Sequence, residues 1–164
     1  MSSKYVAIIG DDYSGSNVMQ LTLLDVTGVL SDIYLDLSDG FRALKSRPYD
    51  LVMIHAGGSC YIPALPGDPG LRQIFAESIQ VDPLHPEKRA HRVPGVYLPR
   101  LRRVKWDPGS WKTNLNTVPI ILVSATDYSK EPWLQLCQPI DTLVKPYSPD
   151  TVQQKVRRLL EAVS

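Results

Sequence analysis

The sequence contains little cysteine and no long apolar run, and each shortage excludes a class of protein. Cys60 and Cys137 are the only cysteines in 164 residues, and neither belongs to a Cys-x-x-Cys pair. Two cysteines are too few for a disulfide framework and make a poor metal site, so we expect reduced thiols in a cytoplasmic protein. The apolar stretch at 6–10 is too short for a secretion signal, and no later run is long enough to span a membrane.

The chain also lacks an excess of charge of one sign. Eighteen Lys and Arg against seventeen Asp and Glu give a net charge of +1, which points to no polyanionic partner for the chain as a whole. The composition is 43% hydrophobic and 21% charged, as in ordinary globular proteins. We therefore expect one soluble domain over residues 1–164, with no membrane segment.

Short apolar runs alternate with amphipathic stretches. Strands are expected at 6–9, 32–37, 51–54, 118–123 and 142–144. Helices are expected from Ser14 or Ser16 to Gly28, at 38–44, 71–80 and 133–137, and from Ser148 onward. In the first helix, the predicted apolar stripe comprises Val18, Leu21, Leu23 and Leu24. This alternation predicts an α/β fold, in which a doubly wound, five-stranded parallel sheet is covered by helices on both faces.

Polar residues follow directly after several of the predicted strands. In a parallel sheet, the ligand site lies at the carboxyl ends of the strands. The candidate site residues at those ends are Asp11, Asp12, His55, Ser124 and Lys145.

These residues stand in an order that resembles the receiver domain of bacterial two-component response regulators. The matching segments are Ile8–Ser14, Tyr49–His55, Pro66–Leu71, Pro119–Ala125 and Asp141–Pro149. The resemblance implies a flavodoxin-like receiver fold with strand order 2-1-3-4-5 and a cis bond before Pro146. It also implies signal transduction or a phosphorelay, with a signalling protein or a component of a histidine kinase pathway as partner.

Two positions depart from the family pattern. His55 occupies the phosphoacceptor position, where the family has aspartate, and Thr142 replaces the aromatic residue of its activation switch. The family's Mg²⁺ site needs oxygen ligands, and imidazole supplies no carboxylate oxygen. The resemblance therefore implies a pseudo-receiver without aspartyl phosphorylation, in which Ser124 and Thr142 hold the switch positions. We expect no cofactor, and at most weak Mg²⁺ binding through Asp12.

The role of each pocket residue is open at this stage. His55 is either a neutral filler, a proton-sensitive group next to carboxylates, or a centre of metal or phosphoryl chemistry. Asp11 and Asp12 are either a relic metal site or loop and capping acids. Lys145 either neutralises the pocket or retains a contact with phosphoryl oxygens.

A long insertion separates the third and fourth strands. His55 and Ser124 are 69 positions apart, much further than in the family, and the extra residues fall roughly at 56–65 and 84–113. The second stretch has eight Lys and Arg against two acids, +8 − 2 = +6. A contact surface there would include Arg89, Arg92, Arg100, Arg102, Arg103, Trp106 and Trp111. It would bind a protein or, less readily, nucleic acid. Alternatively, the insertion covers its own domain or has no specific role. Four prolines argue against a regular helix.

We expect a regulatory domain, not an enzyme, because no nucleophile–base pair with a recognisable spacing occurs. It would act through protein–protein interaction, independently of phosphorylation. The family resemblance adds a homodimer through the face formed by the fourth helix, fifth strand and fifth helix. Two alternatives are a phosphotransfer receiver with unusual acceptor chemistry and a polyanion-binding regulator that uses the basic insertion.

Overall fold

The computed structural model describes residues 2–10, 13–56, 69–77, 79–80, 91–92, 94–105 and 107–162. Five parallel strands form one sheet in the order β2-β1-β3-β6-β7. Their bounds are β1 (Lys4–Ile9), β2 (Val29–Tyr34), β3 (Leu51–His55), β6 (Ile120–Ser124) and β7 (Ile140–Val144). Counted along the chain, this is the predicted order 2-1-3-4-5. The flavodoxin-like fold is therefore confirmed.

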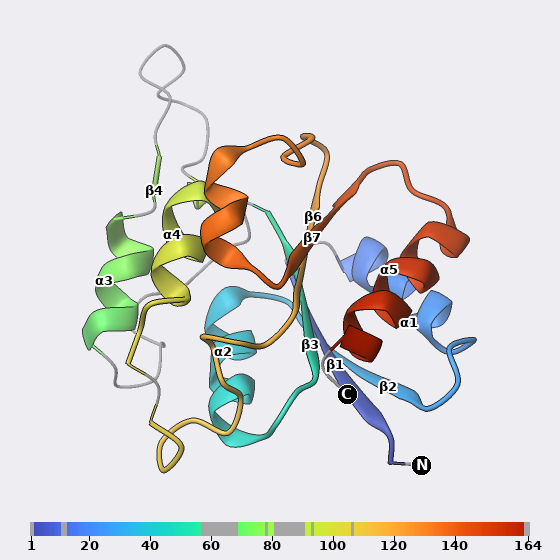
Figure 1. Cartoon of the computed structure of the whole chain (residues 1–164), viewed down its shortest axis with the longest axis horizontal. Coiled ribbons are helices and arrows are strands. Elements are labelled where there is room, and N and C mark those ends of the chain that lie inside the picture. The colour runs from blue at the N-terminus through green and yellow to red at the C-terminus, as the bar shows by residue number, and fades with distance from the viewer. Residues whose placement is uncertain are drawn as a thin grey trace.

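Helices cover both faces of the sheet (Figure 1). On one face lie α1 (Tyr13–Leu23) and α5 (Pro149–Ala162); on the other lie α2 (Leu37–Ser46), α4 (Pro94–Leu101) and the 3₁₀ helix η2 (Pro132–Cys137). The helix α3 (Pro69–Glu77) packs on this second layer, where Phe75 contacts Phe41 and Tyr97 at ring-centroid distances of 5.2 and 5.3 Å. No helix in the described part of the chain is long and apolar enough to cross a bilayer.

The central strands have apolar residues on both faces because each face is covered by helices. All five residues of β3 are buried. At the other end of the chain, Ser148 caps α5 as predicted, since its Oγ accepts a hydrogen bond from the Thr151 N–H at 3.2 Å. Val152, Val156, Leu159 and Leu160 form the buried face of that helix.

Of the predicted apolar stripe of the first helix, Leu23 is confirmed and the other three residues are wrong. The buried residues of α1 are Ser16, Met19 and Leu23, spaced three and four apart along one face. Val18 and Leu21 are exposed because they lie on a neighbouring face of the helix, and Leu24 is exposed in the turn after it. The second strand also begins earlier than predicted, at Val29, where it pairs with Lys4 of β1.

The expectation that prolines prevent a helix in the insertion is also wrong. Helix α4 begins at Pro94 and contains Pro99. A proline at the first helical position removes no hydrogen bond, and burial of Tyr97, Leu98 and Leu101 stabilises the turn that contains Pro99. Ahead of α4, two short antiparallel strands pair, β4 (Ile79–Gln80) and β5 (His91–Arg92).

Candidate functional site at the carboxyl end of the sheet

His55 ends β3 at the centre of the sheet and is only 4% exposed. Leu51, Met53 and His55 are alternate residues of β3, so their side chains point to the same face of the sheet. Leu51 and Met53 belong to the core beneath α1 and α5, and the His55 side chain therefore projects toward that layer. The imidazole lies over Gly10, directly after β1. A Cβ at position 10 would come within 2.6 Å of His55 Cβ, Cγ and Cδ2. The position that carries the acceptor in the family is thus filled by a buried ring.

Ser124 and Lys145 end the two neighbouring strands. The Lys145 N–H donates to the Ser124 carbonyl at 2.8 Å, which fixes both residues at the same edge as His55. The Ser124 hydroxyl accepts a hydrogen bond from the Thr126 N–H at 2.9 Å. A hydroxyl that accepts one bond still has its own proton to donate. The structure therefore brings together His55, Ser124 and Lys145, as the strand order predicts.

The predicted acidic pair follows Gly10 directly. Asp11 and Asp12 lie outside the described residues, so the prediction of a relic metal site there stays a prediction. Among the described residues, no group of three or more His, Cys, Asp and Glu side chains is placed to hold a metal ion. His55 supplies nitrogen where Mg²⁺ would need a third carboxylate oxygen, so the donor set fits that ion poorly.

Thr142 lies in β7, two residues before the strand ends, and pairs in register with Leu122. It lines an open groove of about 380 Å³ together with Asp127, Tyr147 and Lys155. The bond between Lys145 and Pro146 is cis, as the resemblance implies. The groove brings Tyr147 close to the predicted switch position. The sequence analysis did not single out this tyrosine, although it directly follows the Lys-Pro pair.

Two residues assigned to a contact surface on the insertion are buried. The Arg102 guanidinium donates to the carbonyl oxygens of Cys137 at 2.8 Å, Leu115 at 3.1 Å and Pro139 at 2.8 Å. Burial lowers its pKa to about 10, so it stays protonated at neutral pH. Trp111 is also buried, with the Lys45 ammonium 5.8 Å from its ring centroid. Both side chains hold the domain together, so neither belongs to an exposed contact surface.

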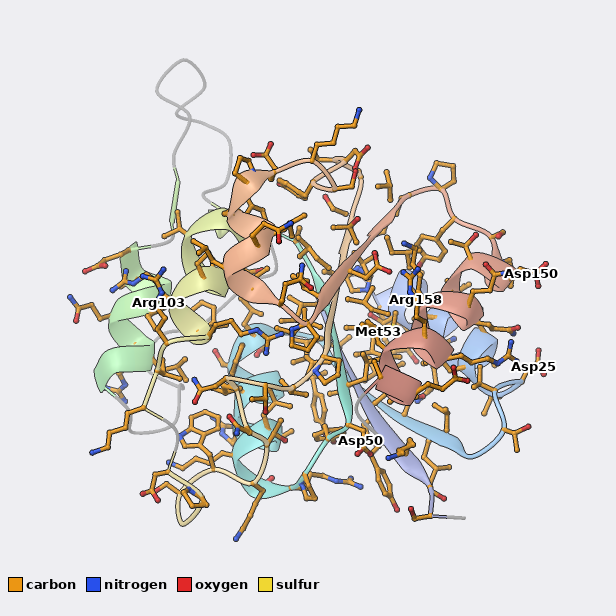
Figure 2. The ribbon with its side chains drawn as sticks, viewed as in Figure 1. Asp25, Asp50, Met53, Arg103, Asp150 and Arg158 are labelled. Carbon is orange, nitrogen blue, oxygen red and sulfur yellow. The ribbon has the colours of Figure 1, made fainter. Side chains whose placement is uncertain are left out.

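Two more residues of that predicted surface, Arg100 and Arg103, lie in the described part of the chain. Arg100 pairs with Glu77 and thereby joins α4 to α3. Arg103 is exposed beyond the end of α4 (Figure 2). Arg89, Trp106 and the side chain of Arg92 lie outside the described residues, so their part of the prediction remains a prediction.

The chain is similar to solved receiver domains along almost its whole length. The receiver domain of the Francisella response regulator 1452 is 15% identical with a TM-score of 0.64, covering 99% of this chain and 100% of that one. The chemotaxis response regulator CheY4 of Vibrio cholerae is 13% identical with a TM-score of 0.62, covering 96% and 99%.

A third structure carries a metal ion. The receiver domain of the sensor histidine kinase PA1611 from Pseudomonas aeruginosa PAO1 has magnesium coordinated in its active site cleft. It is 16% identical to this chain with a TM-score of 0.58, covering 98% and 99%. No family model and no curated protein matches the sequence. At such low identities, these likenesses show that the chain has the receiver fold.

Proposed function

We propose that this chain is a receiver-like signalling domain that acts by binding another protein and accepts no phosphoryl group at position 55. The observation that carries the proposal is the buried imidazole of His55 over Gly10, at the place where a receiver needs a carboxylate. The fold supports a role in two-component signalling, because its solved neighbours are receiver domains.

Burial and ligand chemistry both argue against phosphorylation at this position. A side chain that is 4% exposed presents little surface to a phosphodonor. It also leaves any metal bound by the preceding acids one oxygen ligand short. Transfer to an aspartate in the family's manner therefore lacks both its nucleophile and part of its metal site. Output would depend on the partner, not on a phosphoaspartate.

Ser124 and Lys145 are the residues that would hold phosphoryl oxygens in a receiver. Ser124 and Lys145 end adjacent strands and are joined by the 2.8 Å backbone hydrogen bond. In a non-phosphorylated domain their role is structural, since they close the edge of the pocket. No enzymatic activity is part of the proposal.

The face formed by η2, β7 and α5 is the proposed surface for a protein partner or a homodimer. Leu136 on η2 is 54% exposed, and Arg157 on α5 is exposed. Asp141 of β7 is held by Lys155 at 3.0 Å and also pairs with Arg158. An apolar side chain among fixed charges is an arrangement suited to a partner surface.

Exchange of the residue at position 55 tests the proposal. The wild type, His55→Asp and His55→Asn are each mixed with Mg²⁺ and beryllofluoride, and the amide signals of Ser124 and Lys145 are followed by NMR. Aspartate and asparagine have nearly the same size, and both are smaller than histidine, so neither crowds Gly10. Only aspartate supplies the missing carboxylate.

We expect no signal to move in the wild type or in His55→Asn, and we expect shifts in His55→Asp. Shifts in the wild type that require both Mg²⁺ and beryllofluoride, and that Mg²⁺ alone does not produce, would overturn the proposal, because they would show a working phosphoryl site. If His55→Asp also stays silent, the loss of phosphorylation chemistry extends beyond position 55 and the proposal stands.

A further inference from the structure

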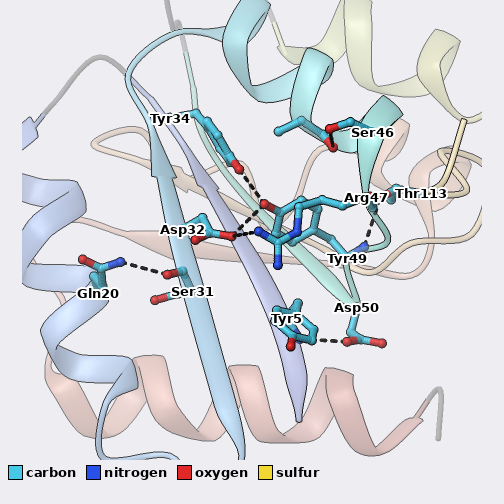
Figure 3. A network of polar contacts seen from close by, with 11 residues as sticks. Tyr5, Gln20, Ser31, Asp32, Tyr34, Ser46, Arg47, Tyr49, Asp50 and Thr113 are labelled. Atoms are coloured by element: carbon cyan, nitrogen blue, oxygen red, sulfur yellow. Dashed lines mark hydrogen bonds and ion pairs between the residues drawn. The ribbon is translucent and has the colours of Figure 1, made fainter. Parts of the chain in front are cut away.

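The strand β2 forms an open edge of the sheet. In a parallel strand, the N–H and C=O groups of one residue point to the same side of the strand, and that side alternates from one residue to the next. The carbonyls of Gly28 and Tyr34 bond to β1, so the polar groups of Val29, Ser31 and Ile33 point outward. Gln20 covers the Ser31 carbonyl with a 2.9 Å hydrogen bond (Figure 3). Within the described residues, the Ser31 N–H and both backbone groups of Ile33 have no partner.

The opposite edge of the sheet is protected. The Pro139 carbonyl and the Lys145 N–H, at either end of β7, bond to β6. By the same alternation, the Thr142 N–H of β7 points outward. That N–H donates to the carboxylate of Asp141 at 2.8 Å. Lys155 and Arg158 hold this carboxylate in place. Charged residues that block an edge are a common protection against strand pairing. On β2, the one outward group that a side chain covers in the described residues is the Ser31 carbonyl, which Gln20 bonds.

Exposed apolar side chains gather around this open edge. Eight large hydrophobic residues are exposed in the described part of the chain, and six of them lie between Tyr13 and Leu35. A groove of about 340 Å³ crosses the edge of β2. Its lining includes Leu21 of α1 (58% exposed), Leu24 just after that helix (68%), Leu30 (50%) and Asp32 of β2, and Arg47 after α2. Side chains from both faces of the sheet line it, so it runs over the strand.

The charge around the edge selects the kind of occupant. Residues 13–41 contain four aspartates and no lysine or arginine. Asp39 pairs with Arg42 at 3.3 Å, whereas Asp25 and Asp36 form no ion pair within the described residues. Asp32 pairs with Arg47 at 3.0 Å and accepts a hydrogen bond from the Tyr49 hydroxyl at 2.8 Å (Figure 3). Asp25 is exposed in the turn after α1 (Figure 2). A second copy would bring the same acidic segment against this one, which like-charge repulsion disfavours.

We propose that β2 binds an extended peptide segment of a partner, in which apolar residues alternate with lysine or arginine. The peptide adds a strand to the sheet, and its backbone bonds to Ser31 and Ile33. Its apolar side chains lie against Leu24 and Leu30, and its cations face the acidic segment. This surface is separate from the pocket around His55, so the inference does not depend on the proposed function.

A blocked peptide of alternating valine and lysine is the probe, and the same peptide with glutamate in place of lysine is its control. Binding to the full chain is measured by fluorescence anisotropy at low and high salt. The variant Leu30→Lys places a charge on the edge. The matched control is Val96→Lys, which adds the same charge at an exposed apolar side chain on α4, outside the groove. Hydrogen exchange reports on the Ser31 and Ile33 amides of the wild type.

We expect the lysine peptide to bind the wild type and to bind roughly tenfold more weakly to Leu30→Lys. Its affinity should be unchanged in Val96→Lys. Bound peptide should slow exchange at Ser31 and Ile33, and salt should weaken binding. The proposal is overturned if the peptide does not bind, or if the glutamate peptide binds equally well. A concentration-dependent dimer that Leu30→Lys abolishes would also overturn it, since a second copy would then occupy the edge.

Discussion

The side chain of His55 lies against the backbone of Gly10, so closely that a methyl group at position 10 would meet three of its atoms at 2.6 Å. His55 ends β3, and Gly10 directly follows the neighbouring strand β1. The size of the side chain at position 55 and the absence of one at position 10 therefore depend on each other. This contact fills the centre of the carboxyl edge, where the proposed loss of phosphorylation chemistry originates.

The substitution Gly10→Ala should destabilise the fold by about 1–3 kcal/mol, because the new Cβ overlaps a buried ring. Urea denaturation measures the change. Combination with His55→Ala should recover most of the loss, since the smaller side chain frees the space. Gly109→Ala is the control, because only the Asp107 side chain lies within 4 Å of the added methyl. If Gly10→Ala lowers the free energy of unfolding as much in the His55→Ala background as in the wild type, the contact between the two residues is contradicted.

Truncation of Tyr97 tests whether the insertion contributes to the core. Its ring is fully buried between α3, α4 and the sheet, 5.3 Å from the ring of Phe75. Tyr97→Ala should lower the free energy of unfolding by about 3–5 kcal/mol. The neighbouring change Val96→Ala, at a partly exposed side chain, should stay within about 0.5 kcal/mol. A small effect of Tyr97→Ala would show that α4 is dispensable.

Arg102 is expected to be structural, because its guanidinium serves three buried carbonyls. Arg102→Met should cost about 2 kcal/mol or more in thermal or chemical unfolding, since those carbonyls lose their donors. Arg103→Met, at the exposed neighbour, should change stability by less than about 0.5 kcal/mol. If the two variants unfold alike, the buried hydrogen bonds contribute nothing measurable.

The pKa of the Glu77 carboxyl should lie below its usual value. The causes are a hydrogen bond from Gln73, which is the larger, and the contact with Arg100. Because the folded pKa is below the unfolded one, this stabilisation is present above the ordinary carboxyl range. It is lost as the pH falls through the folded pKa.

Carboxyl NMR titration measures this pKa. Gln73→Ala should raise it more than Arg100→Ala does. The opposite order would make the ion pair between α3 and α4 the main cause.

The fold could be predicted because its signals are local. Each buried strand, such as 51–54, is a short apolar run, and Ser148 with Pro149 marks the start of the last helix. Strand order followed from the resemblance in the motifs. The site residues His55, Ser124 and Lys145 were placed correctly at one edge because each directly follows an apolar run in a parallel sheet.

The errors concern information that the sequence does not carry locally. The inward face of α1 depends on how the helix docks, and the small Ser16 and unbranched Met19 pack there in place of Val18 and Leu21. Arg102 and Trp111 looked like surface residues because charge and aromaticity suggest recognition. Their burial depends on contacts with distant segments, such as the carbonyls of Cys137 and Pro139.

Intact mass of the wild-type chain after incubation with Mg²⁺ and acetyl phosphate tests the central claim most directly. The account predicts an unchanged mass, together with unshifted amide signals for Ser124 and Lys145. An added phosphoryl group that requires Mg²⁺ would contradict it, and mapping the modified residue would then identify the acceptor.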